Sequence, residues 1–268
     1  MDIADLRRGP HLSASSINDY LECGLYYRYS RIDKLKPAFK SDNLEFGSCI
    51  HKALADFHME RLMGNKMPLD DLRNQFAIYW KERGKGNKEI QYRQGKDFKT
   101  LLTEGKCLLA AFHERRIGTK DQLTVLAIEE PFRFTIEGLP VPIIGIMDLV
   151  EEDPSGSIVI TDSKTASRAY SKEEADRNFQ LSIYHMAAKA NGYGNKNISL
   201  KIDCLVKTKK PKFLQLCTSR TEADELRVIK KIKKVWEALQ KGIFIPNDES
   251  WKCKDCGYAI LCHQWHKE

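Results

Sequence analysis

The sequence predicts a mixed α/β chain, in an α+β layout with one sheet flanked by helices. Three observations support this fold class. Apolar residues recur at helical spacing up to about residue 120, three β-type segments follow directly, and helical and β-type segments then alternate. With 268 residues, of which 42% are hydrophobic and 30% charged, the chain has a globular composition and can bury a sizeable core.

The N-terminal part is predicted to be helical. Ser13 precedes apolar residues at helical spacing, so we expect it to cap a first helix that ends near Cys23. Residues 81–96 are polar, basic and glycine-rich, which predicts a mobile loop. The predicted helices of this part span residues 13–23, 44–64, 69–80 and 97–117.

Beyond these helices the pattern becomes β-type. Three segments rich in Val, Ile, Leu and Phe are separated by turn signals at 137–138 and 153–156, which predicts an antiparallel meander. Thr221 and Asp224 form a predicted capping box for the last helix, and the cysteine-rich tail is expected to be irregular. The predicted strands are 123–136, 140–151, 157–162, 199–206 and 213–218, with helices over 173–191 and from Thr221 through Leu239.

Composition and charge narrow the class of protein. No apolar run reaches the ~18 residues of a membrane span. The N-terminus lacks a secretory signal, so we expect a cytoplasmic protein with no membrane partner and with reduced cysteines. The net charge of +7 is uneven: residues 120–156 hold 2 basic and 8 acidic side chains, and residues 201–268 hold 15 and 9. Such a chain could bind divalent cations and a polyanion, although solvated surface charge explains the pattern more simply.

Two acidic residues and a lysine are predicted to meet in the meander. Asp148 lies in the second strand and Asp162 in the third, so a hairpin centred on Ser155 places them opposite each other, with Cβ atoms about 5 Å apart. Lys164 then falls on the same strand face as Asp162. Paired carboxylates repel unless a cation neutralises them, and such oxygen ligands suit Mg²⁺ or Mn²⁺. Taken alone, the tripeptide Asp162-Ser163-Lys164 is more often an ion pair at the end of a strand.

The surrounding motifs change that balance. They are, in chain order, Leu12-Ser13 to Cys23, Phe46-Gly47-x-x-x-His51, Gly145-x-x-Asp148, Asp162-x-Lys164, Gln180-x-x-x-Tyr184 and the terminal cysteines. In this order and spacing, over almost the whole chain, the sequence resembles the PD-(D/E)xK nuclease superfamily, and within it the RecB-like exonucleases. The resemblance implies a restriction-endonuclease-like core, with a central mixed sheet flanked by helices.

The resemblance also implies roles for the motif residues. Lys164 would be the catalytic lysine. Gln180 and Tyr184, at i and i+4 on one helical face, would orient it, and both would contact the nucleic-acid strand. The ligands of Mg²⁺ or Mn²⁺ would be His51, Asp148, Asp162 and the backbone carbonyl of Ser163.

Other polar residues near these motifs are open to simpler interpretations. A histidine such as His51, on a partly apolar helix face, is more often a core residue, and only the surrounding motifs favour a ligand. His58 has no counterpart in the family pattern and is expected to be structural. Glu129 and Glu130 could add charge near the metal, although an exposed strand position explains them equally well.

The tail holds three thiolates, Cys253, Cys256 and Cys262, in a segment too short to bury its own core. Spacing alone favours zinc, with His263, His266 or a returning Cys23 as the fourth ligand. The chain also resembles the iron–sulfur branch of RecB-like nucleases, which includes AddB-type and CRISPR-associated exonucleases. That resemblance implies a structural [4Fe-4S] cluster on Cys23, Cys253, Cys256 and Cys262. The remaining cysteines, Cys49, Cys107, Cys204 and Cys217, are expected to be buried small hydrophobes.

Basic and aromatic residues suggest where nucleic acid binds. Phosphate contacts are expected from Lys207, Lys209, Lys210 and Lys212. Tyr26, Tyr27 and Tyr29 could stack on unpaired bases, or could instead pack against the tail.

Together these points predict a metal-dependent exonuclease that hydrolyses phosphodiester bonds at single-stranded DNA ends, in DNA repair, recombination or CRISPR adaptation, with protein partners from those pathways. The alternatives are a non-cleaving nucleic-acid-binding subunit and a zinc-tailed nuclease. The chain is expected to be a single nuclease domain. Its parts would be N-terminal helices (1–64), a helical insertion (65–120), a nuclease core (121–220), and a last helix with the iron–sulfur tail (221–268).

Overall fold

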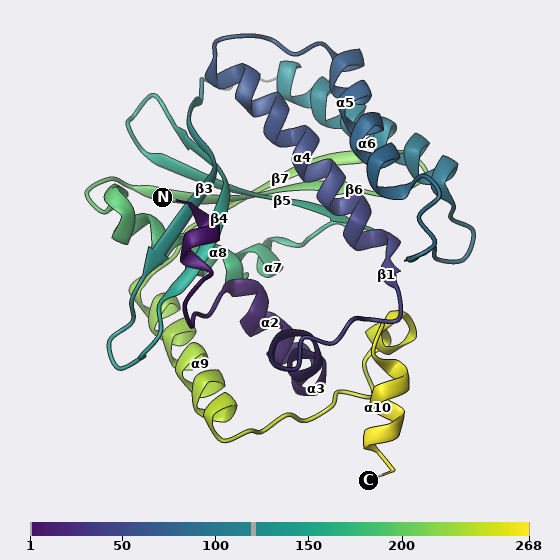
Figure 1. The fold of residues 1–268 in the computed structure, drawn as a ribbon. Coiled ribbons are helices and arrows are strands. Elements are labelled where there is room, and N and C mark those ends of the chain that lie inside the picture. The colour runs from purple at the N-terminus through teal and green to yellow at the C-terminus, as the bar shows by residue number, and fades with distance from the viewer. Residues whose placement is uncertain (1, 119–121, 268) are drawn as a thin grey trace.

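A five-stranded mixed sheet forms the centre of the protein, and helices cover both of its faces (Figure 1). The computed structural model describes residues 2–118 and 122–267. The first three strands form the predicted antiparallel meander, the fourth joins it in parallel, and the fifth is antiparallel to the fourth. In spatial order the strands are β3 (Thr124–Phe134), β4 (Ile143–Glu152), β5 (Ile158–Ala166), β6 (Ile198–Val206) and β7 (Lys212–Thr218). The predicted mixed α/β fold class is confirmed.

Two groups of helices pack on the sheet and form two cores. On one face α4 (Asp42–Leu62), α5 (Leu69–Gly84) and α6 (Phe98–Gly118) enclose a core that contains Phe46, Trp80 and Leu205. On the other face α2 (Ala14–Glu22), α8 (Phe179–Ala188) and α9 (Glu222–Gln240) enclose a core that contains Met147 and Ile202. Because strand side chains alternate between faces, β6 contributes to both cores. No helix of the described residues is long and apolar enough to cross a membrane.

The predicted helix caps are confirmed. The Ser13 side chain accepts a hydrogen bond from the backbone N–H of Ser16 at the start of α2. Thr221 and Asp224 form a reciprocal capping box at the start of α9. Both caps satisfy backbone donors that the first helical turn leaves unpaired.

Three local predictions were wrong. The helix predicted over 173–191 is broken into α7 (Lys172–Asp176) and α8, because Asn178 caps α8 and the Arg220 guanidinium binds the backbone carbonyls at the break. The segment predicted as a mobile loop contains β2 (Ile90–Gln91), which pairs in parallel with β1 (Lys40–Ser41). The tail is not irregular. It forms the 3₁₀ turn η3 (Trp251–Asp255) and α10 (Ala259–Trp265).

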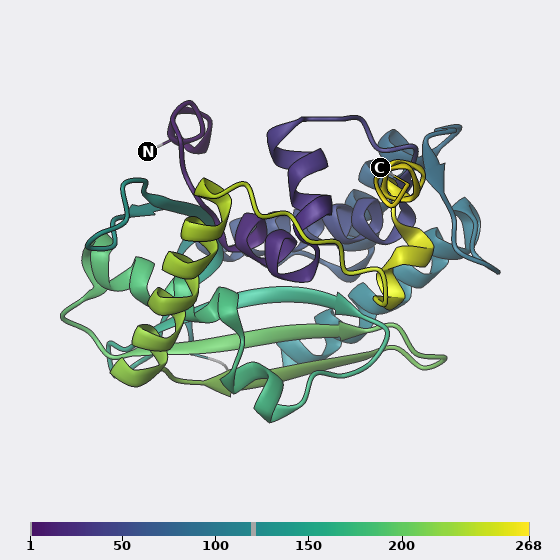
Figure 2. The ribbon, with the colours of Figure 1, turned by 90° about the horizontal axis from the view of Figure 1, so that it is seen from below.

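The short remaining elements are α1 (Ile3–Leu6), α3 (Gly24–Tyr27) and the π-helical turns η1 (Arg28–Ile32) and η2 (Lys189–Tyr193). The tail runs beside α3 and the segment after it (Figure 2). Gly24 N–H donates to the Ile245 carbonyl at 2.9 Å, and the Tyr258 hydroxyl donates to the Leu35 carbonyl at 2.9 Å. A Cβ at Gly24 would lie 2.8 Å from the Ile245 nitrogen, so only glycine permits this approach. The two ends of the chain are therefore joined by direct contacts.

Candidate active site

The candidate active site lies where β4 and β5 separate. Their ladder ends at the pair Leu149–Thr161, and Asp148 and Asp162 occupy the next position. β5 continues to pair with β6 as far as Ala166, so Asp162 and Lys164 lie inside the strand and not at its end. Asp148 Oδ2 accepts the backbone N–H of Ser163 at 2.9 Å. A side chain thus replaces the strand pairing at this point and brings the two carboxylates together.

His51 reaches the same point from α4. Its Nδ1 atom lies 3.4 Å from Asp148 Oδ2, and its side chain is 35% exposed. The residues before it set this position. Phe46 is fully buried in the core between α4 and α5, and Gly47 brings the helix close to Thr165 of β5. A Cβ at Gly47 would lie 3.5 Å from the Thr165 hydroxyl oxygen.

Asp162 and Lys164 form the buried part of the site. Lys164 Nζ donates to Asp162 Oδ1 at 3.0 Å and to Gln180 Oε1 at 2.9 Å. The same ammonium lies 3.0 Å from Asp162 Oδ2 as an ion pair, but that oxygen accepts no hydrogen bond from any described residue. Asp162 is fully buried, so a carboxylate oxygen is left without the hydrogen bond that such groups normally have.

Gln180 and Tyr184 continue this chain of contacts from α8. Gln180 Nε2 donates to the Tyr184 hydroxyl at 2.7 Å, which fixes the amide so that its oxygen faces Lys164. Tyr184 is 2% exposed and packs edge-on against Phe132. Burial, together with Asp148 and Asp162, raises the pKa of Tyr184 well above its ordinary value. Its placement suits an orienting role, because little of the ring is open to a substrate strand.

The charges at the site do not balance. Burial raises the pKa of Asp162, Lys164 opposes this and Asp148 adds to it, and the resulting pKa is about 6. Burial acts to lower the pKa of Lys164, but the two carboxylates outweigh it and the pKa is raised. Two carboxyl groups therefore face a single ammonium, and the centre lacks positive charge.

A divalent cation fits this deficit. In the described part of the chain, no three His, Cys, Asp or Glu side chains are arranged as a complete metal-binding group. The donor chemistry nevertheless suits a hard cation: two carboxylates and an imidazole converge, and the buried Asp162 Oδ2 accepts no hydrogen bond. The Ser163 carbonyl would complete such a set.

Glu129 also lies beside the site. It shares a small pocket of about 20 Å³ with His51, Asp148 and Ser163, and its φ of 48° is unusual for a residue within a strand. Glu130, by contrast, is in regular register with Met147. The flanking strand pairs place Glu129 opposite Asp148, so this cross-strand register, which the sequence did not specify, sets which glutamate faces the site.

A second cluster of buried charge surrounds Glu151, three residues along β4. Its carboxylate binds three cations, which are Arg61 at 2.8 Å, Arg116 at 3.0 Å and Lys201 at 3.5 Å. Burial alone would raise the pKa of Glu151, but the cations lower it to about 2. His58 is found here, bonded to Arg61 at 2.9 Å. Burial, followed by Arg116, lowers its pKa well below the ordinary value and keeps it neutral.

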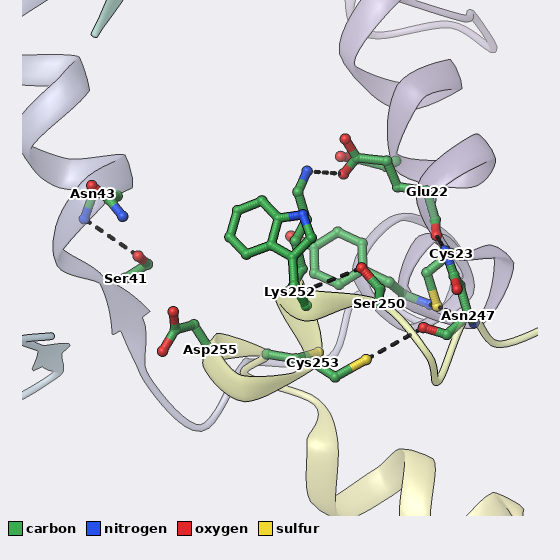
Figure 3. A pocket seen from close by; sticks show the side chains of 13 residues that line it. Glu22, Cys23, Ser41, Asn43, Asn247, Ser250, Lys252, Cys253 and Asp255 are labelled. Atoms are coloured by element: carbon green, nitrogen blue, oxygen red, sulfur yellow. Dashed lines mark hydrogen bonds and ion pairs between the residues drawn. The ribbon is translucent and has the colours of Figure 1, made fainter. Parts of the chain in front are cut away.

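The four cysteines assigned to the cluster converge on one pocket of about 130 Å³. Cys23 Sγ accepts the backbone N–H groups of Tyr26 and Asn247, both at 3.4 Å. Cys253 Sγ donates to the Asn247 carbonyl at 3.3 Å (Figure 3). The other four cysteines differ from the prediction in part: Cys49 and Cys204 are buried, but Cys107 on α6 and Cys217 on the edge strand β7 are exposed.

The predicted nucleic-acid residues fall into separate places. Lys207 lines a recess beyond the end of β5. Lys209, Lys210 and Lys212 are exposed around the connection from β6 to β7. The rings of the three tyrosines have aromatic partners: Tyr26, which is partly exposed, and Tyr29 contact Tyr258 of the tail, and the buried Tyr27 contacts Tyr20. The structure therefore supports the alternative in which these tyrosines anchor the tail.

The fold and the site define a class of enzyme, the nucleases built on a restriction-endonuclease-like core. The chain belongs to the PD-(D/E)XK nuclease superfamily, whose family model matches residues 11–263. The protein is therefore a nuclease, as predicted.

Solved structures and curated proteins were also compared. The crystal structure of a "Putative exonuclease" from Eubacterium rectale aligns with 91% of this chain and 87% of its own, at 14% identity and a TM-score of 0.56. That likeness concerns the fold. The structure of SSO0001 aligns with 98% of this chain and 96% of its own at 12% identity, but its TM-score of 0.32 is too low to support an argument. The search of curated proteins found no match.

Proposed function

We propose that this nuclease is a Mg²⁺- or Mn²⁺-dependent exonuclease that hydrolyses phosphodiester bonds at single-stranded DNA ends. The observation that carries the proposal is a pair of converging carboxylates, Asp148 and the fully buried Asp162, beside a single lysine: Asp162 Oδ2 lies 3.0 Å from the Lys164 ammonium but accepts no hydrogen bond. Leaving such a group unsatisfied is costly, and a bound cation would remove the cost. The Eubacterium rectale protein of similar fold is described as a "Putative exonuclease", which supports this activity over other nuclease activities.

Each residue of the site would have a distinct role in metal binding or catalysis. The cation would be held by His51, Asp148, Asp162 and the Ser163 carbonyl, and when bound it would polarise the phosphate and make water a better nucleophile. Lys164, held by Asp162 and Gln180, would place its ammonium beside the negative charge that develops on the phosphate. Tyr184 would hold Gln180 in the orientation that aims Lys164.

We also propose that Cys23, Cys253, Cys256 and Cys262 bind a [4Fe-4S] cluster. Support comes from their convergence on one pocket and from the two N–H groups that Cys23 accepts, since such bonds commonly accompany cluster thiolates. The purified protein should be brown, absorb near 400 nm, and contain iron and sulfide. A colourless protein that contains stoichiometric zinc would refute the cluster and support the zinc-tailed alternative.

The proposed DNA contacts include Lys207, Lys209, Lys210 and Lys212, whose charges would follow the phosphates of a strand. A role in DNA repair or CRISPR adaptation rests on the sequence resemblance alone.

Cleavage of an end-labelled single-stranded oligonucleotide tests the function. Wild-type protein should shorten it only when Mg²⁺ or Mn²⁺ is present, and Asp162→Asn should abolish cleavage. Asp71→Asn is the matched control, because Asp71 is exposed on α5, and this variant should cleave normally. Metal-dependent binding without cleavage by the wild type would favour the non-cleaving subunit, and equal cleavage by Asp162→Asn would refute the proposed site.

A further inference from the structure

A groove leads away from the candidate active site towards the tail. Its first part is a recess of about 410 Å³ beyond the ends of β5 and β6. Its second part is a pocket of about 300 Å³ between the start of α4, the end of α2 and the tail (Figure 3). Asn43, Trp251 and Asp255 line both parts, so the two parts are adjacent, and together they are called the groove.

The groove begins next to the catalytic lysine. Ala166 lies two residues beyond Lys164 on β5, a distance of about 6.6 Å along a strand. Lys207 N–H donates to the Ala166 carbonyl at 2.7 Å, which fixes Lys207 at that end of the sheet. Tyr170 lines the recess and interacts electrostatically with both Lys164 and Asp162. A strand that leaves the site in this direction therefore meets Lys207 first.

Lys207 is a cation whose charge is not balanced. Its Nζ atom donates to Asn43 Oδ1 at 2.8 Å, and no carboxylate of the described residues lies within ion-pair distance of it. The nearest acids are already engaged, since Asp42 binds Arg93 and Glu104 binds Lys96. Burial, and then Arg93, lowers the pKa of Lys207. A phosphate group would supply the missing negative charge.

Trp251 offers a stacking surface in the same recess, with Lys252 Nζ 5.8 Å from its ring centroid. Its side chain is 75% exposed, although an indole of this size is usually largely buried. Tyr26 also lines the groove and is 37% exposed, but its ring packs edge-on against Tyr258, so Trp251 is the more exposed aromatic side chain of the described groove. Single-stranded nucleic acids bind where a cation that contacts the backbone lies near an exposed aromatic ring.

Of the other charged side chains in the recess, two neutralise each other, and one adds negative charge that opposes the binding of a polyanion. Arg168 and Glu174 neutralise each other. Asp255 is an exposed carboxylate that lines both parts of the groove. Its removal should strengthen binding of a polyanion, which provides a test of opposite sign.

We propose that this groove binds the unpaired strand immediately beside the scissile phosphate, with Lys207 on a phosphate and Trp251 stacked on a base. The tail would then form one wall of the substrate path as well as joining the two ends of the chain. This assignment rests on the nuclease function proposed above, because the strand must lead to Lys164.

Binding of a fluorescein-labelled oligothymidylate, measured in the Asp162→Asn background to prevent cleavage, tests the groove. Trp251→Ala should weaken binding roughly ten-fold, which is the usual effect of losing one base-stacking ring, and Trp251→Phe should retain most of the affinity. Lys207→Gln should weaken binding and reduce the salt dependence by about one phosphate contact, whereas Trp251→Ala should leave the salt dependence unchanged. Asp255→Asn should strengthen binding.

Trp265→Ala is the matched control, because Trp265 is a partly exposed tryptophan of the same tail that lines neither part of the groove. Trp251→Ala binding as tightly as its parent, or losing no more than Trp265→Ala, would overturn the inference. If the Trp251→Ala substitution disturbs the tail, the melting temperature of that variant will fall. The affinity of Trp251→Phe for the oligonucleotide then decides whether the ring binds a base. If the wild type cleaves single strands but Trp251→Ala and Lys207→Gln bind as tightly as their parent, the groove is refuted. The proposed nuclease function would remain intact.

Discussion

Two clusters of buried charge lie three residues apart on β4, and they are balanced in opposite ways. Around Glu151 a single carboxylate meets three cations, and its pKa is lowered to about 2. Around Asp148 and Asp162 two carboxylates meet one lysine, and the pKa of Asp162 is raised to about 6. The first cluster joins α4 and α6 to strands β4 and β6 of the sheet, and the second leaves a carboxylate oxygen without a hydrogen bond.

The difference shows how a buried ionic group can be recognised as structural or functional. In a structural cluster the protein itself supplies the cations that a buried carboxylate needs, since an unpaired buried charge costs several kcal/mol. A cluster that the protein leaves short of positive charge is suited to a cation from outside. Matched substitutions in the two clusters should therefore have opposite effects on activity and on stability.

The largest expected effect is on catalysis. Lys164→Met should reduce cleavage about 10³- to 10⁴-fold, because it removes the ammonium beside the reacting phosphate. Lys201→Met makes the same change in the Glu151 cluster and should lower stability while folded protein still cleaves. Initial rates on single-stranded DNA, corrected for the folded fraction, distinguish them. Equal loss of activity in both variants would show that the clusters do not have separate roles.

The next effect is on stability. Glu151→Gln should lower the free energy of unfolding by about 3–5 kcal/mol at pH 7, because the buried Arg116 and Lys201 and the partly buried Arg61 lose their carboxylate. Denaturant titration measures this loss. The pKa of Glu151 is depressed, so its stabilising contribution is present above pH 4.5 and is lost as the pH falls through about 2. A variant as stable as wild type would contradict this account of the cluster.

The pH dependence of metal-free protein should have the opposite sign at Asp162. Its pKa is raised from 3.8 to about 6, so the folded state favours the protonated acid, and stability is lost as the pH rises through 6. By pH 8 the ionised group should cost up to about 3 kcal/mol. Asp162→Asn, melted in EDTA between pH 4 and 8, should gain stability relative to wild type as the pH rises. A constant difference between the two proteins would argue against a destabilised carboxylate.

The smallest expected effect concerns the amides that support each cluster. Gln180→Met should lower kcat about ten-fold with little change in KM, because Lys164 loses the oxygen that positions it but keeps Asp162. Gln215→Met is the matched change, since Gln215 donates to Asp203 at 3.0 Å beside the Glu151 cluster. It should cost about 1 kcal/mol of stability and leave kcat unchanged. The reverse pattern would contradict a positioning role for Gln180.

The sequence by itself determined the features that depend on local periodicity. Strand alternation and two turn signals predicted the meander, and its register places Asp148 beside Asp162 at the end of the ladder. Side-chain caps at Ser13 and Thr221 were readable because a capping residue lies within four positions of the N–H that it binds. The pairing of Gln180 with Tyr184 followed from the i, i+4 spacing of a helix.

Tertiary structure alone decided the rest. Arg220 breaks a predicted helix from more than forty positions away, and the register of β3 on β4 places Glu129, and not Glu130, in the pocket of His51. The three cations around Glu151 come from separate elements, and Trp251 meets the recess of Lys207 only because the tail folds back across the chain. Such contacts follow no short spacing, because they depend on how distant elements pack against one another, and that packing is set by the whole core and not by any single segment.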